Sequence, residues 1–348
     1  MWYTSFREQV VNLQSGIERK QLQAFLERQS LSLDGDVEYA VALWDGEKLA
    51  ATGSLSGSVL KCIAVDEEFK YLGLSAKIVT HLVQEAYLKG RTHLFIYTKP
   101  ENKTIFTELG FYVIAEIPSK VVLMENTSKG IKNYINEMKS ESAISADAAA
   151  VIVNCNPFTL GHRYLLEYAA ARCRLLHVFV VWEEQSSFPA EIRYKLVQQG
   201  VQHLDNVMLH KGKDYIISKA TFPSYFIKEY QELVKTHARL DLEIFTQHIA
   251  PALGIKKRFV GEEPYCKVTA AYNAAMQEVL PKHGIEVQVV PRMSLEGSPI
   301  SASRVRELIR AGDIHKTKEL VPETTYQFLI SPEAEEIIKH IQSMNKRH

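Results

Sequence analysis

The sequence lacks a long apolar run, closely spaced cysteines and an excess of charge of either sign. No apolar stretch approaches the roughly 20 residues that a membrane-spanning helix needs. The four cysteines have no C-x-x-C spacing, which gives no indication of a zinc or dithiol motif; they are Cys62, Cys155, Cys173 and Cys266. Basic and acidic residues number 41 each, so the charge gives no reason to expect nucleic acid. We therefore expect neither a membrane nor a nucleic acid as a partner.

Further absences concern localisation. The first ten residues, MWYTSFREQV, lack the apolar core of a signal peptide, and unpaired cysteines suit a reducing compartment, so we expect a cytoplasmic protein. What is present is ordinary for a globular protein, with 46% hydrophobic and 24% charged residues. At 348 residues the chain is longer than one core usually supports, which predicts two domains.

The central stretch, VIVNCNPFTLGHRYLLEYAAA at residues 151–171, predicts a buried strand that runs into a helix. The unbroken apolar run at 148–153 is typical of a parallel strand covered on both faces. From Leu160 onward apolar residues recur at helical spacing, so Thr159 and His162 stand at the helix start. Unpaired backbone N–H groups and the helix dipole make such a start an anion site.

This block resembles the Thr/His-x-Gly-His signature of the nucleotidylyltransferases. The chain keeps Pro157, Thr159, Gly161 and His162 of the longer form of that signature. It has Asn156 in place of an Asp and Val153 in place of a Gly. The resemblance implies that His162 and Thr159 stabilise the transferring α-phosphate, and that the surrounding turn binds ATP through Asn154, Asn156, Phe158 and Gly161. Taken alone, T-x-G-H is equally compatible with a helix cap and a surface histidine.

A second block, SPISASRVR at residues 298–306, precedes another helical pattern that closes at Ala311 and Gly312. It is similar to the Ile-Ser-x-Ser/Thr-x-x-Arg motif that accompanies T-x-G-H in nucleotidylyltransferases. The resemblance implies that Ser301, Ser303 and Arg306 hold the β- and γ-phosphates, and hydroxyls and a guanidinium fork suit a polyphosphate. Alone, this block favours an ordinary serine cap. Both blocks in the expected order favour nucleotide chemistry.

The rest of this half predicts strands that alternate with helices. We expect strands at 175–182, 207–210, 241–245, 258–260 and 287–290, and a helix capped by Ser187. Such alternation predicts a parallel, Rossmann-like sheet. The turn VGEEP follows the strand at 258–260, so Gly261 and Glu262 are expected beside the nucleotide.

The first half predicts a mixed sheet. Strands at 38–44 and 48–54 flank the hairpin signal Asp45-Gly46, and another strand at 59–65 leads through a glycine-containing loop into a helix at 76–88. A strand at 93–98, the segment NKTIFTELGFY and a strand at 121–124 follow. This order resembles the GNAT acyltransferases, which implies that the loop binds a pantetheine arm and its pyrophosphate through Val65, Lys70, Gly73 and Ser75. A small α/β domain without a ligand stays open.

Between the halves, residues 126–145 predict a connecting helix and a linker rich in Ser, Lys, Asn and Glu. The fold class expected is therefore α/β. A GNAT-like mixed-sheet domain at 1–125 is followed by a Rossmann-like nucleotidylyltransferase domain at 146–348.

The combination of these two domains, with GEEPYCKVTAAYN between the motifs and LVPETT near the end, resembles the citrate lyase ligase family. The resemblance implies that ATP and acetate form acetyl adenylate, and that the acetyl group passes to the thiol of the dephospho-coenzyme-A-derived prosthetic group on the citrate lyase acyl carrier protein. Mg²⁺ is expected to bind mainly through the phosphates, so no residue is assigned as a metal ligand.

Two other readings remain open at this point. One is a nucleotidylyltransferase that acts on a phosphorylated metabolite and is fused to an independent acetyltransferase. The other is a non-catalytic binding protein whose first domain docks a carrier protein.

Overall fold

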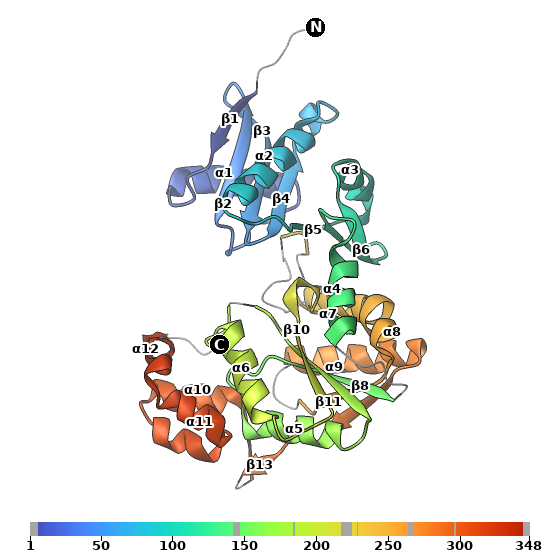
Figure 1. The fold of residues 1–348 in the computed structure, drawn as a ribbon. Helices are drawn as coiled ribbons and strands as arrows, with labels where there is room; N and C mark the ends of the chain where they lie inside the picture. The colour runs from blue at the N-terminus through green and yellow to red at the C-terminus, as the bar shows by residue number, and fades with distance from the viewer. Residues whose placement is uncertain are drawn as a thin grey trace. The chain divides into compact units, whose positions relative to one another are not determined.

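The computed structural model describes residues 6–141, 147–183, 185–216, 225–227, 229–263, 267–295 and 297–343. The chain divides into two compact units (Figure 1). Unit 1 comprises Met1–Asn133 and Phe222–Thr236, and unit 2 comprises Tyr134–Thr221 and His237–His348. Residues 222–236 therefore group with unit 1, although they follow several strands of unit 2 in the chain.

Among the described residues, unit 1 contains a seven-stranded sheet with the order β1-β2-β3-β4-β5-β7-β6. Neighbouring strands are antiparallel except for the parallel pair β4 and β5. The strands are β1 (Arg7–Val10), β2 (Tyr39–Asp45), β3 (Lys48–Ser56), β4 (Val59–Val65), β5 (Phe95–Thr98), β6 (Tyr112–Ile117) and β7 (Val121–Glu125). The helices are α1 (Gly16–Arg28), α2 (Leu74–Leu88), α3 (Lys103–Glu108) and the first residues of α4 (Gly130–Glu141).

The parallel strands β4 and β5 pair only at their beginnings, through Val59 with Phe95 and Leu60 with Ile96. The loop after Val65 leads into α2, whose apolar side packs on the sheet. The predicted hairpin, the strand at 59–65 and the helix that follows it are confirmed.

The sequence analysis missed β1 and β6, the two edge strands of this sheet. β1 has the sequence REQV and therefore no apolar run of the kind that identifies a central strand. β6 begins with the apolar run YVIA, although its first two side chains are exposed.

In the part of the chain that the structure describes, unit 2 contains a five-stranded parallel sheet with the order β10-β9-β8-β11-β12. The predicted Rossmann-like sheet is thereby confirmed. The strands are β8 (Ala148–Val153), β9 (Leu175–Val180), β10 (Val207–Lys211), β11 (Ile255–Gly261) and β12 (Glu286–Val290). The first two crossover helices are α5 (Leu160–Ala170) and α6 (Ala190–Gly200), and α9 (Lys267–Val279) follows β11.

Two local predictions in this unit are wrong. Residues 241–245 are not a strand, because α7 (Tyr230–Ile244) runs through them, and a π-helical turn at Phe245–Ile249 joins α7 to α8 (Ala250–Leu253). Residues on both sides of this helix are buried at 241–245. The sequence DLEIF is therefore as rich in apolar residues as a strand, and the helical periodicity is lost. Ser187 does not cap α6, since the residue that precedes the helix is Pro189 and it makes no side-chain cap.

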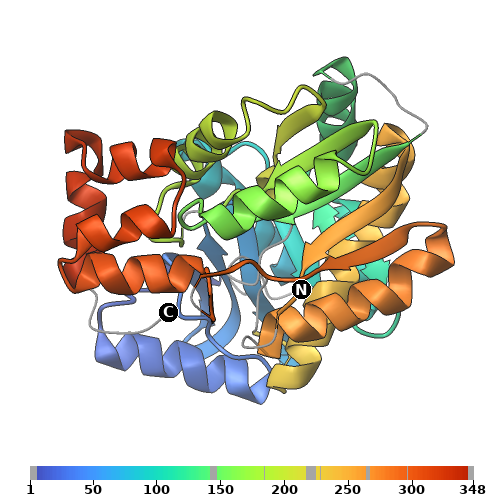
Figure 2. The same cartoon turned by 90° about the horizontal axis from the view of Figure 1, so that it is seen from below.

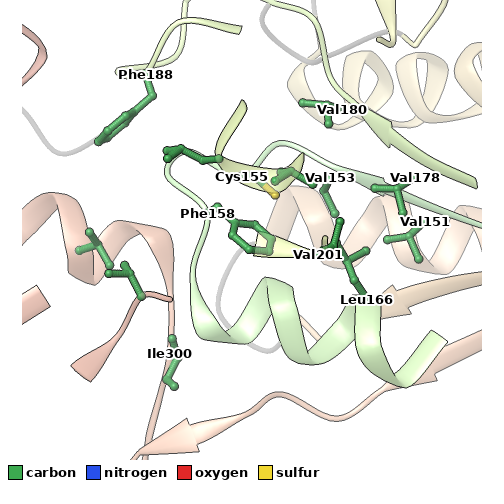
Figure 3. Close-up of a cluster of buried hydrophobic side chains, with 14 of the residues drawn as sticks. Val151, Val153, Cys155, Phe158, Leu166, Val178, Val180, Phe188, Val201 and Ile300 are labelled. Atoms are coloured by element: carbon green, nitrogen blue, oxygen red, sulfur yellow. The ribbon is translucent and has the colours of Figure 1, made fainter. Parts of the chain in front are cut away.

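The core of unit 2 lies between the sheet and helices α5 and α6 (Figure 3). Val151 and Val153 of β8 and Val178 of β9 point into it together with Phe158 and Leu166. This packing places the carboxyl end of β8 and the start of α5 in fixed positions, as burial of apolar side chains requires.

The C-terminal part continues this core. A short hairpin of β13 (Ser294–Leu295) and β14 (Ser298–Pro299) leads into α10 (Ala302–Arg310), which is followed by α11 (Glu323–Leu329) and α12 (Glu335–Ser343). These helices form the orange and red group in Figure 2, in which α10 packs on α12, and α11 packs on α6. Within the described ranges, none of the helices has the length and apolar character needed to cross a membrane.

Candidate active site

A pocket of about 570 Å³ opens at the carboxyl ends of three strands of unit 2, namely β8, β11 and β12. The starts of α5 and α10 form its other walls. Its lining includes eight of the residues expected from the sequence, which are Asn154, Thr159, Gly161, His162, Gly261, Glu262, Ser301 and Ser303. Parallel α/β sheets bind ligands at this end because strand ends and helix starts leave backbone groups unpaired there.

The start of α5 is a reciprocal cap between Thr159 and His162. The hydroxyl of Thr159 accepts a hydrogen bond from the backbone N–H of His162 at 3.3 Å. In return, Nδ1 of His162 accepts the backbone N–H of Thr159 at 3.1 Å. Because Nδ1 acts as an acceptor, the proton of the neutral imidazole resides on Nε2. The cap therefore selects the tautomer in which Nε2 is a donor.

Burial, followed by the nearby guanidinium groups of Arg292 and Arg306, lowers the pKa of His162 to about 4. The imidazole is consequently neutral at pH 7 before a ligand binds. The negative charge of a bound polyphosphate would instead raise the pKa of His162.

The backbone at the start of α5 offers a second donor. The N–H of Leu160 donates to the carbonyl of Leu320, and the N–H of His162 is used by the cap. The N–H of Gly161, which lies between them and lines the pocket, has no protein acceptor among the described residues. Two donors, Gly161 N–H and His162 Nε2–H, are thus available to an anion.

Gly161 also joins the two sequence motifs. A Cβ at this position would lie 3.1 Å from the carbonyl oxygen of Ile300, the residue that precedes the S-A-S sequence. A side chain at position 161 would clash with the backbone of Ile300, which cannot move aside by a rotamer change as a side chain can. At Gly161, α5 therefore approaches the second motif closely.

In the second motif, Ser301 caps α10 by accepting the backbone N–H of Arg304 at 3.2 Å. Arg306 lies one turn further along and does not line the pocket. Its guanidinium donates to the hydroxyl of Ser303 at 3.2 Å and to the backbone carbonyl of Asn156. In this structure Arg306 therefore connects α10 to the turn that precedes α5.

The family described as "Citrate lyase ligase C-terminal domain" matches residues 148–329, which include both motifs and the pocket. A [citrate [pro-3S]-lyase] ligase from Klebsiella pneumoniae is 42% identical over 316 residues, covering 90% of this chain and 92% of the relative. The chain belongs to the citrate lyase ligase family. It is therefore an enzyme, a ligase.

Solved structures similar to each half of the ligase are more distant. An acyl-CoA N-acyltransferase from Pseudomonas aeruginosa covers 35% of this chain and 100% of its own, with 15% identity and a TM-score of 0.31. A bifunctional NMN adenylyltransferase/ADP ribose pyrophosphatase from Francisella tularensis covers 57% of this chain and 52% of its own, with 15% identity and a TM-score of 0.37. These likenesses are too distant to inform the chemistry of the site.

Two expected residues of the ligase lie behind the pocket and do not line it. Asn156 accepts the backbone N–H of Phe188 through its side chain at 3.0 Å. Phe158 is fully buried and lies over Gly200, where a Cβ would meet its ring at 2.2 Å. The ring of His162 stacks on Phe158 with the centroids 6.0 Å apart. Both residues support the turn and the imidazole from the core side.

Sequence reasoning missed Arg292 and its partner Glu263. Arg292 follows β12, donates to the carbonyl of Glu262 at 2.8 Å and pairs with the carboxylate of Glu263. It is the only lysine or arginine among the described residues that line the pocket. The rule that selected Gly261 and Glu262, a position just beyond a parallel strand, applies equally to Arg292, which follows the strand predicted at 287–290.

The described residues of the ligase contain no group of three or more His, Cys, Asp or Glu side chains arranged to hold a metal ion. The pocket does contain the exposed carboxylate of Glu262. One such carboxylate is compatible with a Mg²⁺ ion bound mainly by phosphate oxygens and water.

The loop expected to bind pantetheine lies in unit 1. Val65 ends β4, Gly73 is the residue that precedes α2, and Ser75 is in the first turn of α2. Gly73 has a φ of +73°, and no side chain caps the helix start. Lys70 pairs with Glu67 on the exposed surface. The backbone N–H groups at this helix start are thus not covered by a side-chain cap.

Proposed function

We propose that this ligase forms acetyl adenylate from ATP and acetate, and then transfers the acetyl group to the prosthetic-group thiol of the citrate lyase acyl carrier protein. The observation that carries the proposal is the pair of donors at the start of α5. Gly161 and His162, which supply these donors, are consecutive residues that line a pocket also lined by Ser301 and Ser303. The ligase name of the relatives supports the choice of acceptor.

In the first step, a carboxylate oxygen of acetate attacks the α-phosphorus of ATP, and the bond from that phosphorus to the β-phosphate oxygen breaks. Acetyl adenylate and pyrophosphate result, with no change in the number of protons at the reacting atoms. Acetate is already ionised at pH 7, so the step requires no general base. The protein's task is to orient the reactants and to stabilise charge on the phosphoryl oxygens.

His162 and Gly161 would donate to an oxygen of the α-phosphate. Because the cap fixes Nδ1 as an acceptor, the imidazole cannot turn its donor away without losing its bond to Thr159. Ser301, Ser303 and the start of α10 would hold the departing pyrophosphate. Arg306 would reach the phosphates by leaving the carbonyl of Asn156, or would act from its present position through charge.

Mg²⁺ bound with ATP supplies charge neutralisation at the phosphates. Glu262 would contact its water shell, since this carboxylate is exposed in the pocket.

In the second step, the thiolate attacks the acetyl carbon of acetyl adenylate and AMP leaves, so a thioester is formed and the thiol proton is released to solvent. We assign residues 1–125 to the domain that presents the thiol and residues 146–348 to adenylation. The start of α2, with Gly73, would bind the pyrophosphate of the dephospho-coenzyme A group, since no side-chain cap covers its N–H groups.

The deciding experiment is exchange of labelled pyrophosphate into ATP by the purified protein with Mg²⁺ and without a carrier protein. Acetate-dependent exchange is expected. Exchange that requires a phosphorylated metabolite in place of acetate would replace the proposal with a nucleotidylyltransferase. Absence of exchange with either substrate would contradict adenylation in this pocket.

A further inference from the structure

Arg193 is a fully buried arginine on α6, directly behind the candidate active site. All three nitrogens of its guanidinium donate hydrogen bonds. Nε donates to the carbonyl of Phe188 at 2.9 Å, and Nη2 donates to that of Glu183 at 2.5 Å. Nη1 donates to the carbonyls of Asn154 at 3.0 Å and Val181 at 2.6 Å. Burial of a charge is costly unless it is satisfied in this manner.

The acceptors come from the ends of two neighbouring parallel strands. Asn154 follows β8, whereas Val181 and Glu183 follow β9. Carbonyls beyond the last ladder bonds need partners, and a planar guanidinium with five N–H groups can serve several at once. A lysine ammonium is a single point with three donors and cannot span the same set. Arg193 therefore joins the two loops that leave the sheet at the pocket end.

The two N–H groups of Nη1 are shared among three acceptors, of which the third is Oδ1 of the Asn154 side chain at 2.6 Å. A guanidinium can only donate, so the amide oxygen of Asn154 has to face Arg193. The amide NH₂ then faces away, where it donates to the hydroxyl of Ser186 at 3.2 Å. Asn154 is exposed and lines the pocket. Arg193 thus fixes the orientation of the Asn154 side chain. Its amide oxygen faces the core, and its amide NH₂ group, a donor, faces away from the core.

The turn between Asn154 and Thr159 is held at its other end by Arg306, which donates to the carbonyl of Asn156. Thr159 and His162 follow immediately. A shift of the turn would move the reciprocal cap and its Nε2–H donor relative to the second motif.

We propose that Arg193 is a positioning residue for adenylation, which orients the Asn154 amide and the turn before α5 toward an anionic nucleotide. Only the kinetic test of this role, which measures acetate-dependent pyrophosphate exchange, rests on the proposed function. Arg193 acts through Asn154 and the turn, and does not touch the reacting atoms.

The first test compares Arg193→Lys with Arg258→Met in the full-length protein. Arg258 is a matched control because it is also buried in unit 2, yet its guanidinium donates to Tyr272 at 3.1 Å and to none of the turn carbonyls. Acetate-dependent pyrophosphate exchange is measured per folded active site, with the folded fraction taken from calorimetric unfolding. Arg193→Lys is expected to lower kcat by about ten- to a hundredfold. Arg258→Met is expected to lower Tm but leave kcat within twofold.

The proposal is overturned if Arg193→Lys lowers Tm while kcat and the KM for ATP per folded site are unchanged. It is also overturned if Arg258→Met loses kcat to the same extent, because that result would indicate a general effect of instability.

The second test uses Asn154→Asp, which changes an exposed side chain and keeps an oxygen that can accept from the guanidinium of Arg193. The aspartate can still accept from Arg193, but it presents a negative charge where the amide presented donors. Calorimetric affinity for Mg-ATP is expected to fall at least tenfold, whereas Asn154→Gln, which keeps the amide, is expected to lose less. Equal affinity of wild type and Asn154→Asp would overturn the proposal.

This binding measurement also separates the two proposals. If the wild type shows no acetate-dependent exchange, the proposed function fails. A loss of Mg-ATP affinity in Asn154→Asp and Arg193→Lys would still support the positioning role.

Discussion

Two of the three helix starts that we propose to bind phosphate groups, those of α5 and α2, are built in opposite ways. In unit 2, the start of α5 is closed by side chains, because Thr159 and His162 cap each other. In unit 1, the start of α2 is preceded by Gly73 in a left-handed conformation, and no side chain caps it. The first arrangement fixes the direction and tautomer of one imidazole. The second leaves backbone N–H groups available to a ligand. The start of α5 therefore suits a site in which a reaction takes place, and the start of α2 suits a site that only binds an anionic group.

The largest effect is expected from His162→Ala, which removes the donor that the α5 cap orients. Loss of one preorganised donor costs on the order of 2.7 to 4 kcal/mol in the transition state, or roughly a hundred- to a thousandfold in rate. Acetate-dependent pyrophosphate exchange measures the effect. An unchanged exchange rate would remove His162 from the mechanism and with it the distinction between the two helix starts.

The converse substitution in unit 1 is Gly73→Glu, which places a negative charge at the uncapped start of α2. We expect the rate of thioester formation on the carrier protein to fall roughly thirtyfold, which corresponds to about 2 kcal/mol. The reason is that the new carboxylate would repel the pyrophosphate of the prosthetic group. Pyrophosphate exchange is expected to stay within twofold. Gly90→Glu is the matched control, since Gly90 has a similar φ of +75° and lies in the same unit. Equal losses in both variants would point to backbone strain.

A smaller effect is expected from Gly161→Ala. The added methyl group would lie 3.1 Å from the carbonyl of Ile300, so α5 and the second motif would have to move apart slightly. Exchange is expected to fall about tenfold, which corresponds to about 1.4 kcal/mol. In the control Gly16→Ala, at the start of α1, the new methyl group meets no atom within 4 Å. A wild-type rate in Gly161→Ala would show that the two motifs need not touch.

The last comparison concerns stability and not rate, and it is the response of unit 2 to acid. His177 and His210 of unit 2 are buried and hydrogen-bonded to each other at 2.9 Å. Burial lowers the pKa of His177 to about 4 and, with His177 nearby, that of His210 to about 3. Both stay neutral in the folded state, whereas the unfolded chain takes up protons below about pH 6.5. Their contribution to stability is therefore complete above pH 6.5 and declines as the pH falls toward 4.

We expect the free energy of unfolding of unit 2 to decrease by up to about 1.4 kcal/mol per pH unit for each proton taken up. Urea unfolding monitored by Trp182, with Trp2 and Trp44 replaced, reports unit 2 alone. The double variant His177→Leu/His210→Leu should flatten the dependence. In unit 1, His81 and His93 instead contact the carboxylates of Glu8 and Glu125. Identical acid profiles for the wild type and the double variant would contradict the account.

Much of the fold could be predicted because the central strands carry their own signals. The strand at 148–153 is an unbroken apolar run, and the strand at 59–65 is apolar except for Lys61; both have the predicted bounds. The edge strand β1 was not predictable in this way, since its sequence REQV is mostly polar. β6 was missed although it carries the apolar run YVIA. Residues 241–245 show the opposite failure, because a helix buried on both sides loses the periodicity that distinguishes it from a strand.

The site was predictable where a motif is local and unpredictable where it depends on distant chain segments. The cap between Thr159 and His162 spans three positions, so its residues could be found from spacing. Arg193 has no local pattern, because its partners are carbonyls contributed by other loops. Arg292 could have been found from its position just beyond a predicted strand, but its pairing with Glu263 could not. Likewise, no sequence rule indicates that Arg306 bonds the carbonyl of Asn156.

The contact between Gly161 and Ile300 has a consequence for synthesis of the chain. The ribosome releases β8 and α5 long before the residues that complete the pocket, so a nascent chain exposes the α5 donors without the second motif. Contacts between distant segments also form late in folding, because loop closure precedes them. A stalled or truncated product that ends before residue 300 would thus carry the T-x-G-H sequence but lack Ser301 and Ser303, so that one wall of the pocket would be missing.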